Sequence, residues 1–212
     1  MRHYPRYEQQ NFDEVMDLIH QQSTCFLQTI SDTGVIQNGI FNHLLLDRKL
    51  FFHLHRDDEQ VKSIARANEC LVLFHDVLGT LPSYWLDAKY GGAATTFYRY
   101  AEIRCTARFV EDSEEKAELL KSMLACYQPE GGYEPVRYQS PTYQHKIDQL
   151  MLLECEIADF RAKWKLGQNR TPNEMQELAT KFRDRNIGND ERCANEIEKW
   201  VQKRKQEANE EH

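Results

Sequence analysis

The spacing of apolar residues changes from helical to extended early in the chain. Between Asn11 and His20 apolar residues recur every three or four positions, which predicts an amphipathic helix with Asn11 as its cap. After it, apolar residues alternate with polar ones or form short runs that end at turn sequences such as SDTG and DR. This pattern predicts antiparallel strands at 24–31, 35–47 and 49–55.

The rest of the chain mixes both periods. We expect the following order: helix 58–68, strand 70–75, loop 77–94, strand 95–110, helix 112–127, helical turn 143–150, strand 151–165, helix 172–186 and helix 190–207. Thr171, Pro172 and Glu174 form a capping box with proline at the first helical position. Helices interspersed with consecutive strands favour an α+β fold built on a mostly antiparallel barrel.

Composition narrows the function classes. The chain has 212 residues, 41% of them hydrophobic, so it can bury a sizeable core. Its net charge of −7 argues against broad binding to nucleic acid or anionic membranes. No apolar run reaches the roughly 18 residues of a transmembrane helix, and the first residues lack the apolar core of a signal peptide. We therefore expect a cytoplasmic protein.

The cysteines predict a reduced interior. Six are present, none close enough to another to form a CxxC motif: Cys25, Cys70, Cys105, Cys126, Cys155 and Cys193. Four of them stand in apolar runs, where a thiol behaves as a small hydrophobic group. We assign no metal site to them.

The first candidate site is KLFFHLHRDDEQVKSIARAN, where a strand ends at the start of a helix. Arg56 and Lys62 offer cationic donors beside the free amides of a helix N-terminus, which is a reasonable phosphate cradle. The alternative is structural, because the acidic run from Asp57 to Glu59 is also favoured at a helix start. His53 and His55 fit an ordinary half-buried strand equally well.

The second candidate is LPSYWLDAKYGGAATTFYRY. Its aromatic residues, together with Ser83, Lys89, Thr95 and Arg99, suit the wall of a pocket for a planar ligand. A lid over the core or a dimer interface is the structural alternative. Hydrolase, P-loop, dinucleotide and zinc-protease motifs are absent from the sequence, so no catalytic residue is assigned.

Three segments together resemble the PaiB-like branch of the pyridoxamine 5'-phosphate oxidase-like, FMN-binding split-barrel family. KWKLGQNR is similar to that branch's KFKLSQN signature and is the most specific of the three. FNHLLLDRKLFFHLHRDDEQVKSI resembles the strand, hairpin and NPQ-type helix start near the flavin. LPSYWLDAKYGGAATTFYRY resembles the SPSWY loop and the TWNY-type strand, and the resemblance covers roughly residues 1–185.

The resemblance implies a six-stranded split barrel at 1–185, with 186–212 as a C-terminal helical extension. It also implies a homodimer with FMN at each of two sites between the subunits. Lys163 would lie on the rim of the flavin site, and Trp164 would face the opposite side of the strand and pack in the core. The implied cofactor-binding residues are His43, His53, Arg56, Gln60, Lys62, Ser63, Ser83, Trp85, Thr95, Thr96, Lys165, Gln168 and Asn169.

Three hypotheses for the function follow. The first is a homodimeric FMN oxidoreductase of unknown substrate, with a reduced nicotinamide as the suggested electron donor. The second is a PaiB-like negative transcriptional regulator, although the acidic charge and the lack of a recognisable helix-turn-helix disfavour direct DNA binding. The third is a split barrel that has lost FMN, which the acidic run at Asp57 would explain by repelling a phosphate. Such a barrel would bind another planar ligand such as haem. The candidate haem ligands are His43, His53, His55 and His75.

Overall fold

The computed structural model describes residues 4–210 and confirms an α+β fold with an antiparallel sheet and flanking helices. The helices and strands follow the chain as η1 (Pro5–Tyr7), β1 (Glu8–Gln9), α1 (Phe12–Gln21), β2 (Thr24–Ile30), β3 (Ile36–Asn42), β4 (Leu44–Leu46), β5 (Lys49–His55), α2 (Glu59–Ala67), β6 (Glu69–Leu81), η2 (Ser83–Trp85), η3 (Gly91–Ala93), β7 (Thr95–Val110), α3 (Ser113–Tyr127), α4 (Gln144–Gln149), β8 (Leu150–Lys165), α5 (Pro172–Arg185) and α6 (Asp190–Glu210). Within residues 4–210 no helix is long and apolar enough to cross a membrane.

The chain divides into two compact units, each described by itself. The first unit holds the residues up to Val15, then His75–Ala101 and the chain from Arg161 onward. The second unit holds Met16–Phe74 and Glu102–Phe160. Strands β6, β7 and β8 contribute residues to both. The predicted boundary between 185 and 186 stays a prediction, although α5 and α6 belong to the same unit.

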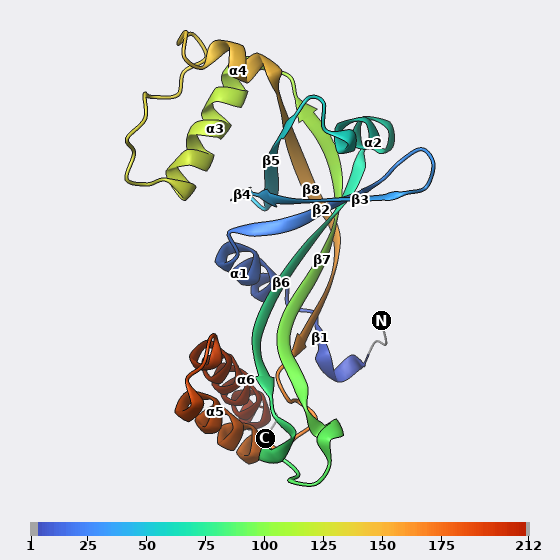
Figure 1. Cartoon of the computed structure of the whole chain (residues 1–212), viewed down its shortest axis with the longest axis vertical. Helices are drawn as coiled ribbons and strands as arrows, with labels where there is room; N and C mark the ends of the chain where they lie inside the picture. The colour runs from blue at the N-terminus through green and yellow to red at the C-terminus, as the bar shows by residue number, and fades with distance from the viewer. Residues whose placement is uncertain (1–3, 211–212) are drawn as a thin grey trace. The chain divides into compact units, whose positions relative to one another are not determined.

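Hydrogen bonding joins the strands in the order β3-β2-β6-β7-β8-β5-β4, and β1 pairs with β8 (Figure 1). The described residues form eight strands where six were predicted, and β1 and β4 are very short. The single strand expected at 35–47 is interrupted at His43. There the Tyr127 hydroxyl accepts the His43 N–H at 3.0 Å and lies 2.5 Å from the His43 carbonyl oxygen. The Tyr127 side chain thus takes the place of a neighbouring strand at the backbone N–H and carbonyl of His43.

In the second unit, α3 covers the strands β4, β5 and β8. The contact is an apolar cluster formed by Leu44, Phe51, Val110, Leu119, Met123 and Leu152. Helix α4 lies next to α3 in Figure 1, and both contribute to a smaller cluster with Ala117, Val136 and Ile147. Asp58 caps α2 by accepting the Gln60 N–H at 2.9 Å, and left-handed Asn68 ends the helix, as predicted.

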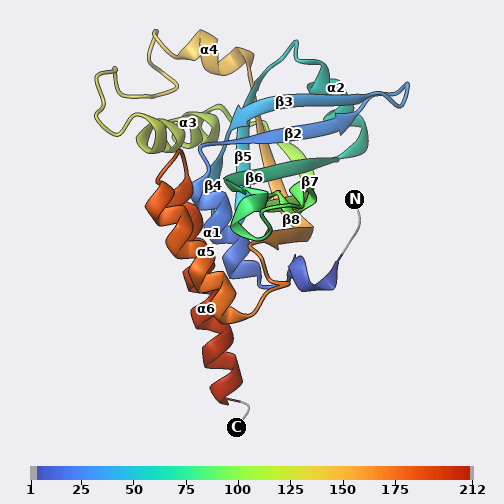
Figure 2. The same cartoon turned by 60° about the horizontal axis from the view of Figure 1, so that its bottom comes forward.

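In the first unit, α5 and α6 pack side by side (Figure 2). Arg183 on α5 bonds Glu198 on α6 at 2.9 Å. Apolar residues of both helices are buried, and the α6 stripe predicted from the sequence is Ala194, Ile197 and Val201. The capping box of Thr171 and Glu174 is formed as expected.

Strand β6 corrects one prediction, because it continues to Leu81 where a loop was expected from residue 77. Asp76 breaks the apolar run in the sequence, yet its side chain is buried. Its carboxylate bonds the Arg99 guanidinium of β7 at 2.5 Å and the Arg192 guanidinium of α6 at 2.8 Å. These two guanidinium groups offset the cost of burying the Asp76 carboxylate, so β6 continues past Asp76.

Candidate functional site

The thirteen predicted cofactor-binding residues fall into two groups, one in each unit. The second unit holds His43, His53, Arg56, Gln60, Lys62 and Ser63. The first unit holds Ser83, Trp85, Thr95, Thr96, Lys165, Gln168 and Asn169. The two groups are therefore two separate candidate sites.

Gln60 and Ser63 on α2 hold the helix against the sheet. The buried Gln60 side-chain amide donates to the Leu27 carbonyl at 2.8 Å and to the Gln37 carbonyl at 3.3 Å. The Ser63 hydroxyl donates to Gln37 Oε1 at 2.7 Å, and the Thr29 hydroxyl donates to the same oxygen at 3.0 Å. Their polar atoms are therefore engaged within the protein.

The cavity at the start of α2 does not concentrate positive charge. It has a volume of about 340 Å³ and is lined by Ser31, Asp32, Gln37, Asp57, Glu59, Lys62, Ser63 and Arg66. Two basic side chains thus share it with three carboxylates. Arg56 is not among the lining residues and donates to the Asp148 carbonyl at 2.6 Å. Lys62 and Ser63 thus line one cavity without Arg56, and the phosphate cradle of Arg56 and Lys62 stays a prediction.

The two histidines of this group differ in burial. His53 is exposed on β5, whereas His43 is 5% exposed and packs edge-on against the Phe74 ring at 4.9 Å. His43 Nε2 lies 3.3 Å from the Ile19 carbonyl, and its Nδ1 has no hydrogen-bond partner among the described residues. Burial lowers the pKa of His43 to about 4. His43 is therefore a neutral core residue at pH 7.

The end of β8 gathers basic and aromatic side chains. Lys165 donates to the Thr95 hydroxyl on β7. The Lys163 ammonium lies over two rings, 5.7 Å from the centre of Tyr7 and 5.8 Å from that of Tyr98. Trp164 between the two lysines is 4% exposed, so it faces the core as predicted. We call Lys163, Lys165, Tyr7, Tyr98 and Thr95 the lysine–tyrosine cluster.

The loop after β8 holds the cluster in place through its own backbone. Gln168 accepts the Leu166 N–H at 2.8 Å and donates to the Trp164 carbonyl at 2.7 Å. Gly167 has a φ of +90°, and an added Cβ would meet the Phe97 ring at 3.1 Å. Asn169 Oδ1 accepts from the Tyr7 hydroxyl at 3.5 Å. Gln168 therefore shapes the loop, while Asn169 reaches the cluster.

The two lysines of the cluster form no close ion pair among the side chains described. Glu8 stands opposite Lys163 in the β1–β8 pairing, but among the side chains of residues 4–206 no carboxylate forms an ion pair with Lys163 or Lys165. Burial and the nearby Lys163 charge lower the pKa of Lys165. Two adjacent cations beside aromatic rings form a surface suited to an anionic, planar ligand.

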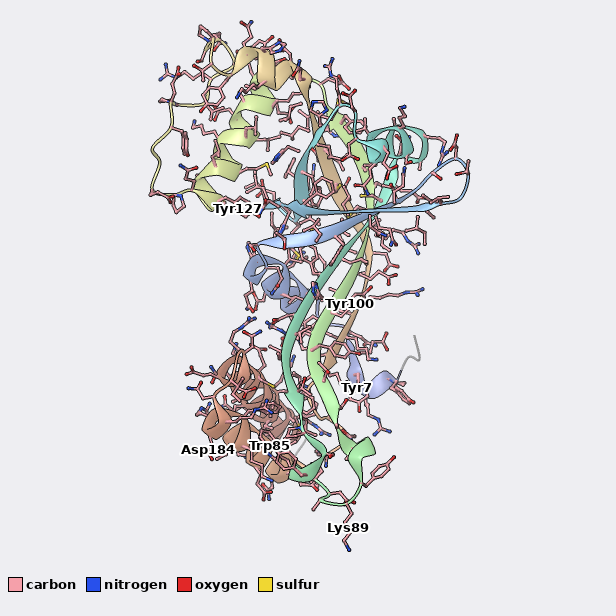
Figure 3. The ribbon with its side chains drawn as sticks, in the orientation of Figure 1. Tyr7, Trp85, Lys89, Tyr100, Tyr127 and Asp184 are labelled. Carbon is pink, nitrogen blue, oxygen red and sulfur yellow. The ribbon has the colours of Figure 1, made fainter. Side chains whose placement is uncertain are left out.

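Of the remaining predicted residues, Ser83 and Trp85 belong to η2 and Thr96 belongs to β7. The Trp85 ring packs edge-on against Phe182 of α5 at 5.1 Å, and the Arg185 guanidinium lies 4.8 Å from its centre (Figure 3). Ser83 and Thr96 are half-buried. Trp85 thus anchors α5 to the loop.

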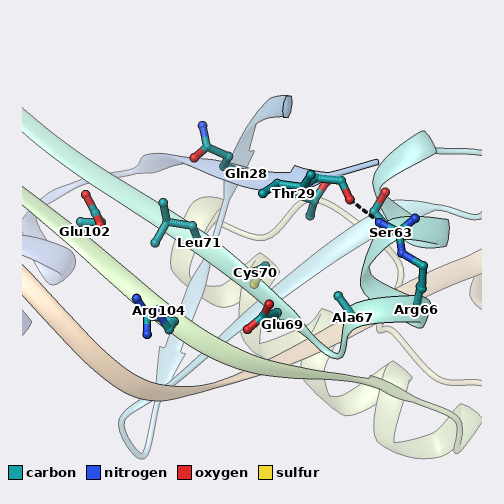
Figure 4. A pocket seen from close by; sticks show the side chains of 11 residues that line it. Gln28, Thr29, Ser63, Arg66, Ala67, Glu69, Cys70, Leu71, Glu102 and Arg104 are labelled. Carbon is teal, nitrogen blue, oxygen red and sulfur yellow. Dashed lines mark hydrogen bonds between the residues drawn. The ribbon is translucent and has the colours of Figure 1, made fainter. Parts of the chain in front are cut away.

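The second unit also contains a cavity that the sequence did not indicate. It has a volume of about 390 Å³ (Figure 4). Its lining residues are Gln28, Thr29, Ile30, Ser63, Arg66, Ala67, Glu69, Cys70, Leu71, Glu102 and Arg104. Arg66 donates to the Ile30 carbonyl at 2.7 Å, which fixes one wall.

Sequence comparison identifies the family. The family described as "Putative FMN-binding domain" matches residues 1–159. The chain belongs to this family. The match ends before the KWKLGQNR segment, and no curated protein matches the chain.

Solved structures share the fold. The flavocytochrome Anf3 from Azotobacter vinelandii has 14% identity and a TM-score of 0.65, over 78% of this chain and 72% of that one. The FAD and heme binding protein from Mycobacterium smegmatis has 12% identity and a TM-score of 0.63, over 80% and 78%. Together with the family match, these similarities confirm the split-barrel fold.

The pKa of His43 predicts a pH-dependent stability. Its folded pKa lies below the unfolded value, so the unfolded state binds the proton more tightly and stability falls as pH falls below the unfolded pKa. Between pH 7 and 5 this one group should remove about 2 kcal/mol from the free energy of unfolding. Urea unfolding across that range measures the change.

Replacing His43 with Leu should flatten this pH dependence, whatever its effect at pH 7. His145→Leu, at an exposed position on α4, is the matched control and should keep the wild-type slope. An unchanged slope in His43→Leu would contradict the assignment.

Proposed function

We propose that this protein is a cytoplasmic, homodimeric FMN-binding oxidoreductase whose lysine–tyrosine cluster holds the flavin phosphate. The supporting observation is the pair Lys163 and Lys165, two cations that form no ion pair with the carboxylates described within residues 4–206. A phosphate dianion would balance their charge. We thus assign the phosphate to the end of β8 and not to the cavity at the start of α2, where Asp57 and Glu59 are lining residues.

The donor set of the cluster fits FMN in two respects. Lysine is a compact cation that binds phosphate oxygens well, and the Lys165 side chain is already oriented by its bond to Thr95. Tyr7 and Tyr98 supply apolar ring surface beside the cations. Bound FMN would supply hydride or single-electron chemistry, with a reduced nicotinamide as the proposed donor. The protein's own residues bind, orient and shield the cofactor.

An exposed apolar face of the second unit supports the homodimer. The pairing of β2 with β3 places Ile30 opposite Ile36 and Phe26 opposite Ile40, so these side chains share one face of the sheet. The Gln28–Asn38 pair, hydrogen-bonded at 2.8 Å, lies between them on the same face. The three isoleucines are 58–66% exposed. A second copy of the chain covering this face would remove that apolar surface from water.

A PaiB-like regulatory role is the alternative proposal, and the helices lend direct DNA binding little support. Helix α6 carries the basic run KWVQKRKQ, but Val201 is buried and Lys203 pairs with Glu14 at 3.0 Å. With a net charge of −7, a regulator of this kind would act through a partner protein.

Removing both cluster lysines tests the cofactor site. Lys163→Ala combined with Lys165→Ala should weaken FMN binding by at least about 100-fold, because two charged contacts to a phosphate are each worth about 1.5–3 kcal/mol. Riboflavin, which lacks the phosphate, should bind the variant and the wild type about equally. Quenching of flavin fluorescence measures both affinities.

Lys121→Ala, at an exposed lysine on α3, is the matched control and should bind FMN as the wild type does. Unchanged FMN affinity in the double variant, with the wild-type circular dichroism spectrum, would contradict the site.

Charge on the sheet face should break the dimer. Ile40→Glu places a carboxylate on the apolar face and should yield a monomer in light scattering after size-exclusion chromatography. Ile187→Glu is the control, because Ile187 is equally exposed at 66% but lies in the other unit. A wild-type chain that is itself monomeric, or an Ile40→Glu dimer, would rule out this interface.

A further inference from the structure

Three buried cysteines meet inside the second unit. Cys70 on β6, Cys105 on β7 and Cys155 on β8 are 6%, 0% and 0% exposed, and we call them the thiol triad. The Sγ atoms of Cys70 and Cys155 lie 3.5 Å apart. The Cys105 thiol is hydrogen-bonded to both of the others. Nothing in the proposed flavin site uses these thiols.

The register of β6 and β7 places two of the thiols opposite each other. The Ala107 N–H donates to the Asn68 carbonyl at 2.9 Å, where these two strands begin to run antiparallel. Continuing this register for two residues along each strand places Cys70 opposite Cys105. The ion pair of Asp76 with Arg99 follows the same register. Opposed residues of a hydrogen-bonded pair have Cα atoms about 5.5 Å apart, which lies within the range that a disulfide can span.

We propose that Cys70 and Cys105 form a reversible cross-strand disulfide when a peroxide enters the second unit. The proposal is independent of flavin binding. The Cys70 thiolate attacks the peroxide, an S–O bond forms, the O–O bond breaks, and hydroxide leaves to become water. The Cys105 sulfur then attacks the Cys70 sulfenic acid, an S–S bond forms, and the S–O bond breaks. The Cys105 proton leaves with that hydroxide as a second water, so peroxide is reduced as two thiols are oxidised.

Cys70 is the residue on which the peroxide acts. Hydrogen bonds from the Cys105 and Cys155 thiols lower its pKa, which raises the thiolate fraction that reacts. Against the opposing hydrogen bond to Cys155, the hydrogen bond to Cys70 and burial raise the pKa of Cys105, and burial raises the pKa of Cys155, so both of these thiols keep their protons in the reduced triad. Cys70 also lines the cavity of about 390 Å³, which admits a small oxidant (Figure 4).

The sheet makes the disulfide reversible. Opposed residues of a hydrogen-bonded pair hold their Cβ atoms farther apart than the mean of about 3.8 Å in disulfides. A cross-strand bridge there is strained, and strained disulfides are the more easily reduced ones. A thiol reductant should therefore restore the triad.

Peptide mapping of the peroxide-treated full chain tests the proposal. All six cysteines are free in the reduced protein, and treatment should remove two of the six thiols. Mass spectrometry should find the Cys70 peptide joined to the Cys105 peptide, and dithiothreitol should release it. Survival of all six thiols would overturn the proposal. A bridge from Cys70 to Cys155, or links through the exposed Cys126 alone, would also overturn it.

Two variants distinguish a specific bridge between Cys70 and Cys105 from unspecific oxidation of the thiols. Cys105→Ser combined with Cys155→Ser should lose the bridge and leave Cys70 as a sulfenic acid that dimedone captures, because the Cys155 sulfur lies 3.5 Å from the Cys70 sulfur and would otherwise replace Cys105. Cys193→Ser, at a buried cysteine of the other unit, should keep the Cys70–Cys105 bridge. If the double variant does not fold, the wild-type peptide map alone decides between the outcomes. Absence of dimedone labelling in a folded double variant would contradict attack at Cys70.

Discussion

The alternation of side chains along the long strands is the constraint on which the rest of the structure depends. Because successive residues of a strand face opposite sides, each buried position determines its neighbours. Trp164 is buried, so Lys163 and Lys165 face away from the core and become available to a ligand. The same rule turns Cys70 and Cys105 inward together and leaves Ile36 and Ile40 on the outside. Core, candidate cofactor site and apolar face thus have one geometric origin.

Charge compensation distinguishes the two places where an anion was expected. At the start of α2, Asp58 satisfies a free amide and three other carboxylates line the cavity beside Lys62, so the protein balances its own charge. At the end of β8, no carboxylate among the side chains of residues 4–206 forms an ion pair with Lys163 or Lys165. In a chain with a net charge of −7, a local pair of cations held close enough to lower a lysine pKa carries an electrostatic cost. An anionic ligand would relieve it.

Most of the fold follows from local patterns in the sequence. Strands β5 and β7 begin and end where alternation predicted, and Asp58, Asn68 and Thr171 mark helix ends as their chemistry requires. The extension of β6 did not follow, because the partner that makes a buried Asp76 acceptable is 23 residues away on β7. Local periodicity carries no information about such a pairing.

The candidate site was predictable only in part. The spacing of Lys163, Trp164 and Lys165 indicated which side chains face outward, and Thr95 was expected near them. Tyr7 was not expected, because the β1–β8 pairing that brings it to Lys163 joins distant parts of the chain. The roles of Gln60 and Gln168 were also hidden, since both amides bind backbone groups that only the folded chain presents.

The visible absorption spectrum of the purified wild-type protein, followed by titration with FMN and with riboflavin, measures whether the lysine–tyrosine cluster binds the flavin phosphate. We predict flavin absorption bands and a clear preference for FMN over riboflavin, because the phosphate would meet Lys163 and Lys165. Equal affinity for the two flavins, or no binding of either, would contradict it.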